Sequence, residues 1–177
     1  MLELINVTNL NAMPAQRLLH ASLASLVSAW EAYIEKVIVE YYSAINRPMD
    51  AAFNAIHTIA KGFADGTLSK FNTPNADNAR RILISATGYD PIGDWQVRLM
   101  NGADTRNRLN EILNTRHSFA HGFPLPAHSW LLSPSGLPRF TKGILKEIAH
   151  TFRELVEKTD EGIANHVVTT FGLAKPW

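Results

Sequence analysis

The chain has 177 residues, of which 46% are hydrophobic, and its 17 basic and 16 acidic residues leave a formal net charge of +1. This length suits a single domain over residues 1–177 with one sizeable core, and no hydrophobic run is long enough to cross a membrane. The opening residues lack the pattern of a secretory signal. The absence of cysteine excludes disulfides and thiolate metal sites, and it fits a cytoplasmic location.

A net charge near zero argues against a broad, unspecific nucleic-acid coat. The charges are unevenly spread, however, because ten basic residues stand against five acidic ones between Arg80 and Arg153. This local excess could attract a phosphate backbone at short range. The alternative is an ordinary solvated surface, with the positive excess balanced by acidic residues at both ends of the chain. Charge alone favours that alternative. The residues counted are Arg80, Arg81, Arg98, Arg106, Arg108, Arg116, Arg139, Lys142, Lys146 and Arg153, against Asp90, Asp94, Asp104, Glu111 and Glu147.

A long helix is predicted from Pro14 to about Ile45. Residues 1–13 show no clear period and are predicted to form an extended or strand-like lead-in. Proline is tolerated in a first helical turn, and Asn46-Arg47-Pro48 ends the helix. The apolar residues recur at steps of three and four, which is typical of one buried helix face. They are Leu19, Leu23, Leu26, Val27, Trp30, Ile34, Val37, Ile38 and Tyr41.

A second helix is predicted from Asp50, a good N-cap residue, to about Ala64. Its apolar residues follow helical spacing, so we expect them to form a buried stripe. These residues are Phe53, Ile56, Ile59, Ala60 and Phe63. The sequence Asp65-Gly66-Thr67 is then expected to turn the chain.

A third helix is predicted over residues 74–87, with Gly88 suited to the position just after its last turn. Residues 89–100 follow as a loop. Trp95 is expected to anchor this loop on the core rather than to contact a ligand.

A fourth helix is predicted from an Asp104 cap to Gly122. The connection over residues 123–138 is rich in proline, serine and glycine, and it leaves room for a small hairpin around residues 133–136. The final helix is predicted over residues 141–170.

Gly162 could bend the final helix. Sustained alternation of apolar and polar residues, the pattern of a strand, is absent from the chain. The sequence therefore predicts an all-α fold. We expect an antiparallel helical bundle of about five helices, two of them long.

The end of the fourth helix carries an arginine and two histidines in the segment Arg116-His117-Ser118-Phe119-Ala120-His121-Gly122. Arg116 is expected to continue the apolar stripe of this helix, where a buried arginine needs an anionic partner. Arg116 and His121 would diverge by about 140° in a regular helix. They converge only if the helix ends near Ala120, and Gly122 favours such an ending.

A histidine at a helix C-terminus can donate and accept a proton near neutral pH, and a guanidinium beside it can stabilise a phosphoryl oxygen. We therefore expect Arg116, His117 and His121 to form a phosphate-handling site. Neither a metal nor a cofactor is expected, since two histidines with no nearby carboxylate make a poor zinc site. Glu31, beside the buried stripe of the first helix, could hold Arg116 or His121 through a charge-assisted hydrogen bond, or it could face water.

These segments resemble a known family. Arginine, four residues and then histidine, with a polar residue directly after the arginine, resembles the motif of HEPN domains. The Ala-His-Gly at residues 120–122, the first-helix sequence SLVSAWEAYIEKVIVEYY and the segment FNTPNADNARRILISATGYD are similar to RiboL-PSP-type HEPN proteins. The resemblance covers roughly Leu18 to Gly122.

The resemblance implies a HEPN-like homodimer that brings two motifs together across a two-fold axis. It implies a metal-independent endoribonuclease in a toxin or defence setting, with an antitoxin or another protein partner. The RNA's own 2′-OH would attack the adjacent phosphorus, which restricts the substrate to RNA. In this scheme His121 shuttles the proton, Arg116 stabilises the phosphorane and His117 positions phosphate or water.

Two other functions are open. In the first, the chain is a non-catalytic interaction module that binds a protein, a nucleotide or RNA, and Arg116 is a member of a buried ion pair. In the second, the anion site holds a free nucleotide, which would stabilise the folded protein.

Overall fold

The computed structural model describes residues 12–177, with side chains from Ala15 onward. Within that range the chain forms five α-helices and two short 3-10 helices, and its β-structure is limited to two isolated bridges. The all-α prediction is therefore confirmed. The lead-in predicted over residues 1–13 lies outside the described range except at its last two residues, which are already helical.

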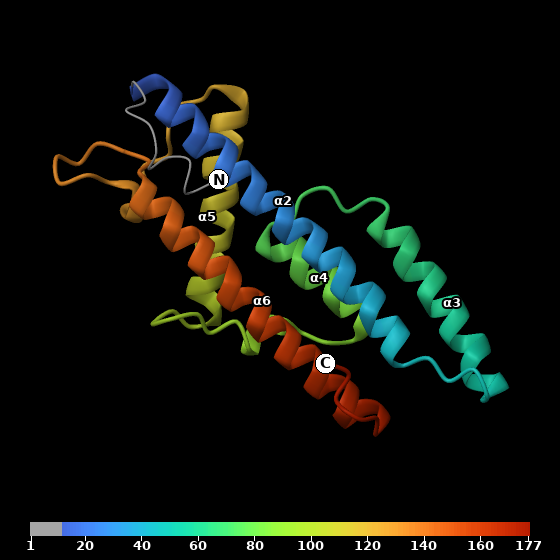
Figure 1. Ribbon diagram of the computed structural model, residues 1–177. Helices are drawn as coiled ribbons and strands as arrows, with labels where there is room; N and C mark the ends of the chain where they lie inside the picture. The colour runs from blue at the N-terminus through green and yellow to red at the C-terminus, as the bar shows by residue number, and fades with distance from the viewer. Residues whose placement is uncertain (1–11) are drawn as a thin grey trace.

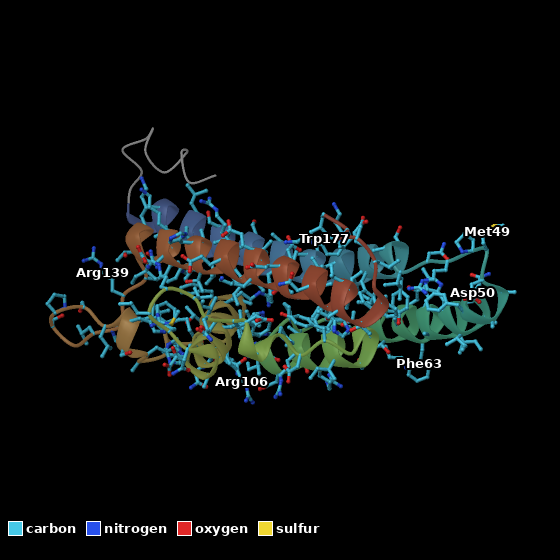
Figure 2. The ribbon with its side chains drawn as sticks, turned by 90° about the horizontal axis from the view of Figure 1, so that it is seen from below. Met49, Asp50, Phe63, Arg106, Arg139 and Trp177 are labelled. Carbon is cyan, nitrogen blue, oxygen red and sulfur yellow. The ribbon has the colours of Figure 1, made fainter. Side chains whose placement is uncertain are left out.

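Two long helices, α2 (Ala12–Ala44) and α6 (Lys142–Phe171), pack along each other as one layer (Figure 1). The second layer holds α4 (Ala76–Thr87) and α5 (Gly102–His121), and α3 (Ala51–Leu68) extends it at one end (Figure 2). The 3-10 helices Pro91–Gly93 and Ser129–Leu131 lie in the connections that flank α5. None of the helices in residues 12–177 combines the length and apolar character of a membrane span.

The two long helices run in the same direction. Residue numbers in contact rise together along the two helices: Trp30 of α2 contacts Phe152 of α6, and Tyr41 contacts Phe171. The antiparallel arrangement that we predicted holds for α2 and α3, which a short connection joins, and is wrong for α2 and α6 (Figure 1).

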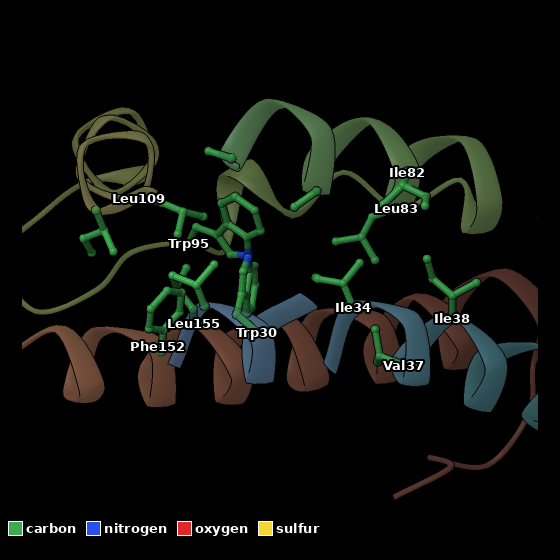
Figure 3. Close-up of a cluster of buried hydrophobic side chains, with 14 of the residues drawn as sticks. Trp30, Ile34, Val37, Ile38, Ile82, Leu83, Trp95, Leu109, Phe152 and Leu155 are labelled. Carbon is green, nitrogen blue, oxygen red and sulfur yellow. The ribbon is translucent and has the colours of Figure 1, made fainter. Parts of the chain in front are cut away.

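The core between the layers is centred on two buried indoles, Trp30 and Trp95, whose rings meet edge to face at 6.0 Å (Figure 3). Each indole N–H has a partner, as a buried donor requires. Trp30 Nε1 donates to the carbonyl of Pro74 and Trp95 Nε1 to the hydroxyl of Thr159, both at 2.9 Å. The predicted role of Trp95 as the anchor of its loop is confirmed.

Gly162 does not interrupt α6, which continues from Lys142 to Phe171. Gly162 is a packing position. A Cβ atom there would overlap the Tyr89 hydroxyl, which donates to Asp94 at 2.6 Å. The absence of a side chain lets the Tyr89 loop lie directly against α6.

Several helix ends follow local capping. Asp50 caps α3 as predicted, and its side chain accepts from the Phe53 N–H at 3.0 Å. Gly88 takes the left-handed conformation after α4, with φ 74°. The cap of α5 is Asn101 rather than the predicted Asp104, whose own N–H donates to the Asn101 side chain.

Two predicted turns differ from the structure. The chain does not turn at residues 65–67, because α3 continues through them to Leu68. The predicted hairpin is a turn rather than a strand pair. It is closed by an isolated antiparallel bridge between Leu132 and Pro138, and the Ser133 N–H donates to the Leu137 carbonyl.

The apolar stripe predicted for the second helix is mostly on the outside, so that prediction is wrong. Ile56, Ile59 and Phe63 are 69%, 74% and 79% exposed. The side of α3 that meets the chain carries Ala64, which is buried, and His57, which bonds to the backbone of Tyr42.

Candidate functional site

The α5 terminus is set by a glycine. Gly122 has φ 68° and ψ 22°, a left-handed conformation that suits glycine because it has no Cβ. The N–H groups of Gly122 and Phe123 both donate to the Ser118 carbonyl. The predicted helix end at Gly122 is confirmed, and His121 is the last helical residue.

Arg116, His117 and His121 are all exposed at this terminus. The prediction that Arg116 continues the apolar stripe is therefore wrong. The buried side of α5 continues instead from Leu109 and Ile112 through Thr115 and Ser118. Thr115 can be buried because its hydroxyl donates to the Glu111 carbonyl at 2.8 Å.

The two histidines form a ring cluster with Phe123. The His117 and His121 ring centroids are 4.3 Å apart, as expected for residues four apart on a helix. Phe123 stacks on His121 at 5.7 Å and lies 6.0 Å from His117. Phe123 is itself 57% exposed, so the cluster is an aromatic surface open to solvent.

Arg116 lies on a different side of the helix from His121. The helix is regular through His121, so these residues keep the angular separation of about 140° that five helical steps impose. Among the described residues, no hydrogen bond or ion pair joins the guanidinium to either histidine. The structure therefore brings His117 and His121 together and places Arg116 on the flank.

Glu31 of α2 faces that flank. It is half-buried, and burial together with the negative charge of Glu35 raises the pKa of its carboxyl group. The positive charge of Arg116 acts on this pKa in the opposite sense, which shows that the two groups are electrostatic neighbours. Within the described part of the chain they make no direct bond. Glu31 thus neither holds Arg116 directly nor faces water alone.

His20 also lies in this region, although the sequence indicated only an ordinary surface or core histidine there. Its ring stacks on Phe119 of α5, with the centroids 3.5 Å apart, and burial lowers the pKa of the imidazole. The Gln16 side-chain amide lies 3.0 Å from His20 Nε2. The available signal was position, since His20 and Glu31 are eleven positions apart, about three helical turns, and so lie on the same side of α2.

Nine of the ten cations in residues 80–153, all except Lys142, fall into two groups. Arg80, Arg98, Arg106 and Arg108 make ion pairs with carboxylates. Within the described residues, five others make no ion pair: Arg81, Arg116, Arg139, Lys146 and Arg153. Arg139, Lys146 and Arg153 follow Arg116 in the chain, so most of these five cations lie from the end of α5 onward.

The described residues offer no metal centre, since no three of their His, Asp or Glu side chains gather in a group that could hold a metal ion. The chemistry available at the α5 terminus is that of two imidazoles, one guanidinium and an exposed phenyl ring. Together these groups can bind an anion, exchange a proton and stack on a planar ring.

Comparisons with known proteins give one positive finding. The family model of RiboL-PSP-HEPN matches residues 2–165, a span that contains α2 to α5, most of α6 and all four candidate site residues. Neither the curated proteins nor the solved structures contain a significant match.

Proposed function

The chain belongs to the RiboL-PSP-HEPN family, and from that membership we propose that it is a metal-independent endoribonuclease with its active site at the α5 terminus. One observation carries the proposal: two exposed histidines and, on the flank beside them, an exposed arginine lie in the last two turns of α5, where a macromolecular substrate can reach them. The match to the family model confirms the resemblance that the sequence predicted, at the level of the family.

The proposed reaction is an internal transesterification of RNA. A neutral His121 accepts the proton of a 2′-OH, and the freed oxygen attacks the adjacent phosphorus. The bond from phosphorus to O5′ breaks, and the imidazolium of His121 returns the proton to that oxygen, which leaves His121 neutral again. The products are a 2′,3′-cyclic phosphate and a free 5′-OH.

The other side chains stabilise charge and position the substrate. Arg116 stabilises the negative charge of the phosphorane, which a guanidinium can do through two parallel hydrogen bonds. His117 positions a phosphate oxygen beside His121. Glu31 limits the freedom of Arg116 through its charge, and Phe123 offers a surface on which a base can stack.

RNA is thus the proposed partner and a homodimer the proposed working form. The toxin or defence setting and the antitoxin rest on the family resemblance, and the expected cytoplasmic location rests on the absence of cysteine. They add nothing to the chemistry.

The test is RNA cleavage in EDTA by the wild type and by the Arg116→Ala and His121→Ala variants. Each substitution should reduce the rate at least about a hundred-fold. Because both side chains are exposed, the melting temperature should hardly change. Arg81→Ala, which removes an exposed arginine of α4, is the matched control and should cleave like the wild type.

A second arm replaces the ribose at the cleaved position by 2′-deoxyribose. Cleavage should stop, because the nucleophile is gone. Equal rates for the wild type and both variants, or cleavage of the deoxy substrate, would contradict the proposal.

The alternative is a non-catalytic module that binds RNA, a nucleotide or a protein. The observation that favours it is the angular separation of Arg116 and His121, which no direct bond bridges in the described residues. The version with a buried Arg116 ion pair is no longer tenable, because Arg116 is exposed. Binding of RNA that depends on Arg116 but yields no cyclic phosphate would identify this function.

A further inference from the structure

We propose that the pocket between α3 and α4 binds a phosphate monoester of a small hydroxylated molecule, the chemistry that sugar phosphates and mononucleotides share. The two helices pack against each other (Figure 1), and the connection between them supplies part of the lining. The pocket volume is about 390 Å³, within the range of small-molecule sites. The proposal adds a second site to the protein and does not depend on the ribonuclease activity.

The pocket uses a segment that has no role in the proposed cleavage. Residues 71–90 form the segment FNTPNADNARRILISATGYD, which the sequence singled out. Two of its lining residues precede α4, and the others lie three or four positions apart on one side of that helix. They are Phe71, Asn72, Asn78, Arg81, Ile82 and Ser85.

Two cations line the pocket with no acidic partner. Lys70 follows α3, Arg81 lies in the middle of α4, and both are exposed. Within residues 15–177, whose side chains are described, neither makes an ion pair. The acids nearest to them in sequence are already paired, since Asp65 bonds to a lysine of α3 at 2.7 Å and Asp77 to an arginine of α5 at 2.5 Å. The positive charge of the pocket is therefore available to an anion.

The Arg81 guanidinium is held in place by Asn78. Its Nη2 donates to Asn78 Oδ1 at 2.9 Å, and Asn78 Nδ2 donates to the Thr73 carbonyl at 2.9 Å. The other N–H groups of the guanidinium remain for a ligand, and a phosphate can accept two of them in parallel. An arginine that is already oriented loses less freedom when it binds.

The end of α3 opposes an anion only weakly. A helix C-terminus carries negative partial charge on carbonyls that lack hydrogen-bond partners. The last four carbonyls of α3, from Asp65 to Leu68, all accept hydrogen bonds, from the N–H groups of residues 69–71 and from the Ser69 hydroxyl. The full charge of Lys70 therefore outweighs what remains of the helix dipole.

The other lining groups favour an organic phosphate over the inorganic ion. The Thr67 and Ser85 hydroxyls each donate to a carbonyl of the preceding helical turn, so their oxygens can accept from hydroxyl groups of a ligand. Phe71 and Ile82 form an apolar wall on which a carbon skeleton can lie. A phosphate monoester with hydroxyl groups satisfies all of these residues, whereas inorganic phosphate satisfies only the cations.

The pocket is separate from the α5 terminus. Among the described residues, none from α5 lines it. The first turn of α4 meets α5 at Asn110, whose side chain accepts from the Ala76 N–H at 2.9 Å. His121 follows eleven positions later, about 16 Å along the helix. An anion in the pocket therefore neither reaches nor blocks that terminus.

The experiment is a titration of the ¹⁵N-labelled full chain with ribose 5-phosphate, followed by the amide signals in NMR spectra. The shifts should be concentrated in residues 70–72 and 81–85, with a Kd on the order of 1 mM for a ligand of this size. Ribose, which lacks the phosphate, should bind at least about ten-fold more weakly. Adenosine monophosphate is the second probe. Tighter binding of this probe would identify a nucleotide as the ligand, and equal or weaker binding a sugar phosphate.

Lys70→Ala and Arg81→Ala should each weaken the binding of ribose 5-phosphate at least about ten-fold. Both side chains are exposed, so both variants should keep the thermal melt. Lys146→Ala is the matched control, because it removes an exposed lysine of α6 that makes no ion pair in the described part of the chain. It should bind like the wild type.

Three results would overturn the proposal: no shifts in residues 70–72 and 81–85, binding that Arg81→Ala leaves unchanged, or equal binding of ribose. Shifts confined to residues 116–123 would also overturn it and would assign the anion to the α5 terminus. RNA cleavage is a separate readout. Arg116→Ala should lose cleavage and keep the binding of ribose 5-phosphate, so failure of the pocket and failure of the ribonuclease proposal can be told apart.

Discussion

The helices α2 and α3 carry apolar stripes with the same spacing but opposite surroundings. In α2 the stripe is buried, with Leu23 and Ile34 fully inaccessible, whereas in α3 Ile56 and Phe63 face solvent. The difference comes from position in the fold. Helix α2 is surrounded by α3, α4, α5 and α6, while α3 lies at the edge and packs on α2 and α4. Periodicity identifies side chains that share a face, and the neighbouring elements decide whether that face is covered.

The sharpest test of this comparison makes one substitution in both helices. Ile34→Ala should lower the free energy of unfolding by about 2–5 kcal/mol, because it leaves a cavity in the core. Ile59→Ala should change it by less than about 0.5 kcal/mol, because the side chain is 74% exposed. Urea unfolding in dilute solution measures both. A large loss for Ile59→Ala would mean that the exposed stripe of Ile56, Ile59 and Phe63 is packed within the chain.

Glycines give a second comparison, with effects of opposite sign. Gly162→Ala should destabilise the fold by about 1–3 kcal/mol, because a Cβ atom there would displace the Tyr89 hydroxyl from its bond with Asp94. Gly62→Ala should stabilise the monomer by about 0.5–1 kcal/mol through helix propensity. Thermal melts at low protein concentration measure the change in stability of both variants. Changes of the same sign at the two glycines would contradict this comparison.

The smallest expected effect concerns His20, which α5 covers. Burial lowers the pKa of its imidazole below the ordinary 6.5, so the unfolded chain binds the proton more readily. This contribution to stability is present above pH 6.5 and is lost as the pH falls through the folded-state pKa. Glu31 acts in the opposite sense, because its raised pKa favours the folded state in acid and this contribution is lost as the pH rises.

His20→Phe isolates the histidine contribution, because phenylalanine keeps the ring on Phe119 and cannot titrate. Its melting temperature should depend less on pH between about 7 and 5 than that of the wild type. Identical pH profiles would mean that His20 is not desolvated by α5.

Much of the fold could be predicted, since local interactions determine it. The order and type of the helices, the Asp50 cap and the left-handed glycines at Gly88 and Gly122 all depend on residues within one or two turns. The composition of the candidate site and the family followed from the same local segments.

The orientation of the site could not be predicted. A helix rotates 100° per residue, so Arg116 and its neighbour Thr115 compete for the buried side. Only packing against α2 and α4 decides that the threonine takes it. The stacking of His20 on Phe119 likewise joins residues far apart in the chain, which no short pattern records.

The sequence by itself therefore determined an all-α chain, several helix ends such as those at Asp50, Gly88 and Gly122, and the group of Arg116, His117 and His121. Propensity, capping and spacing act over a few residues. The tertiary structure alone decided that α2 and α6 run in the same direction, that Arg116 faces solvent and that the apolar stripe of α3 is uncovered. Each of these features depends on which elements meet, and that choice minimises exposed apolar area over the whole chain rather than within any one segment.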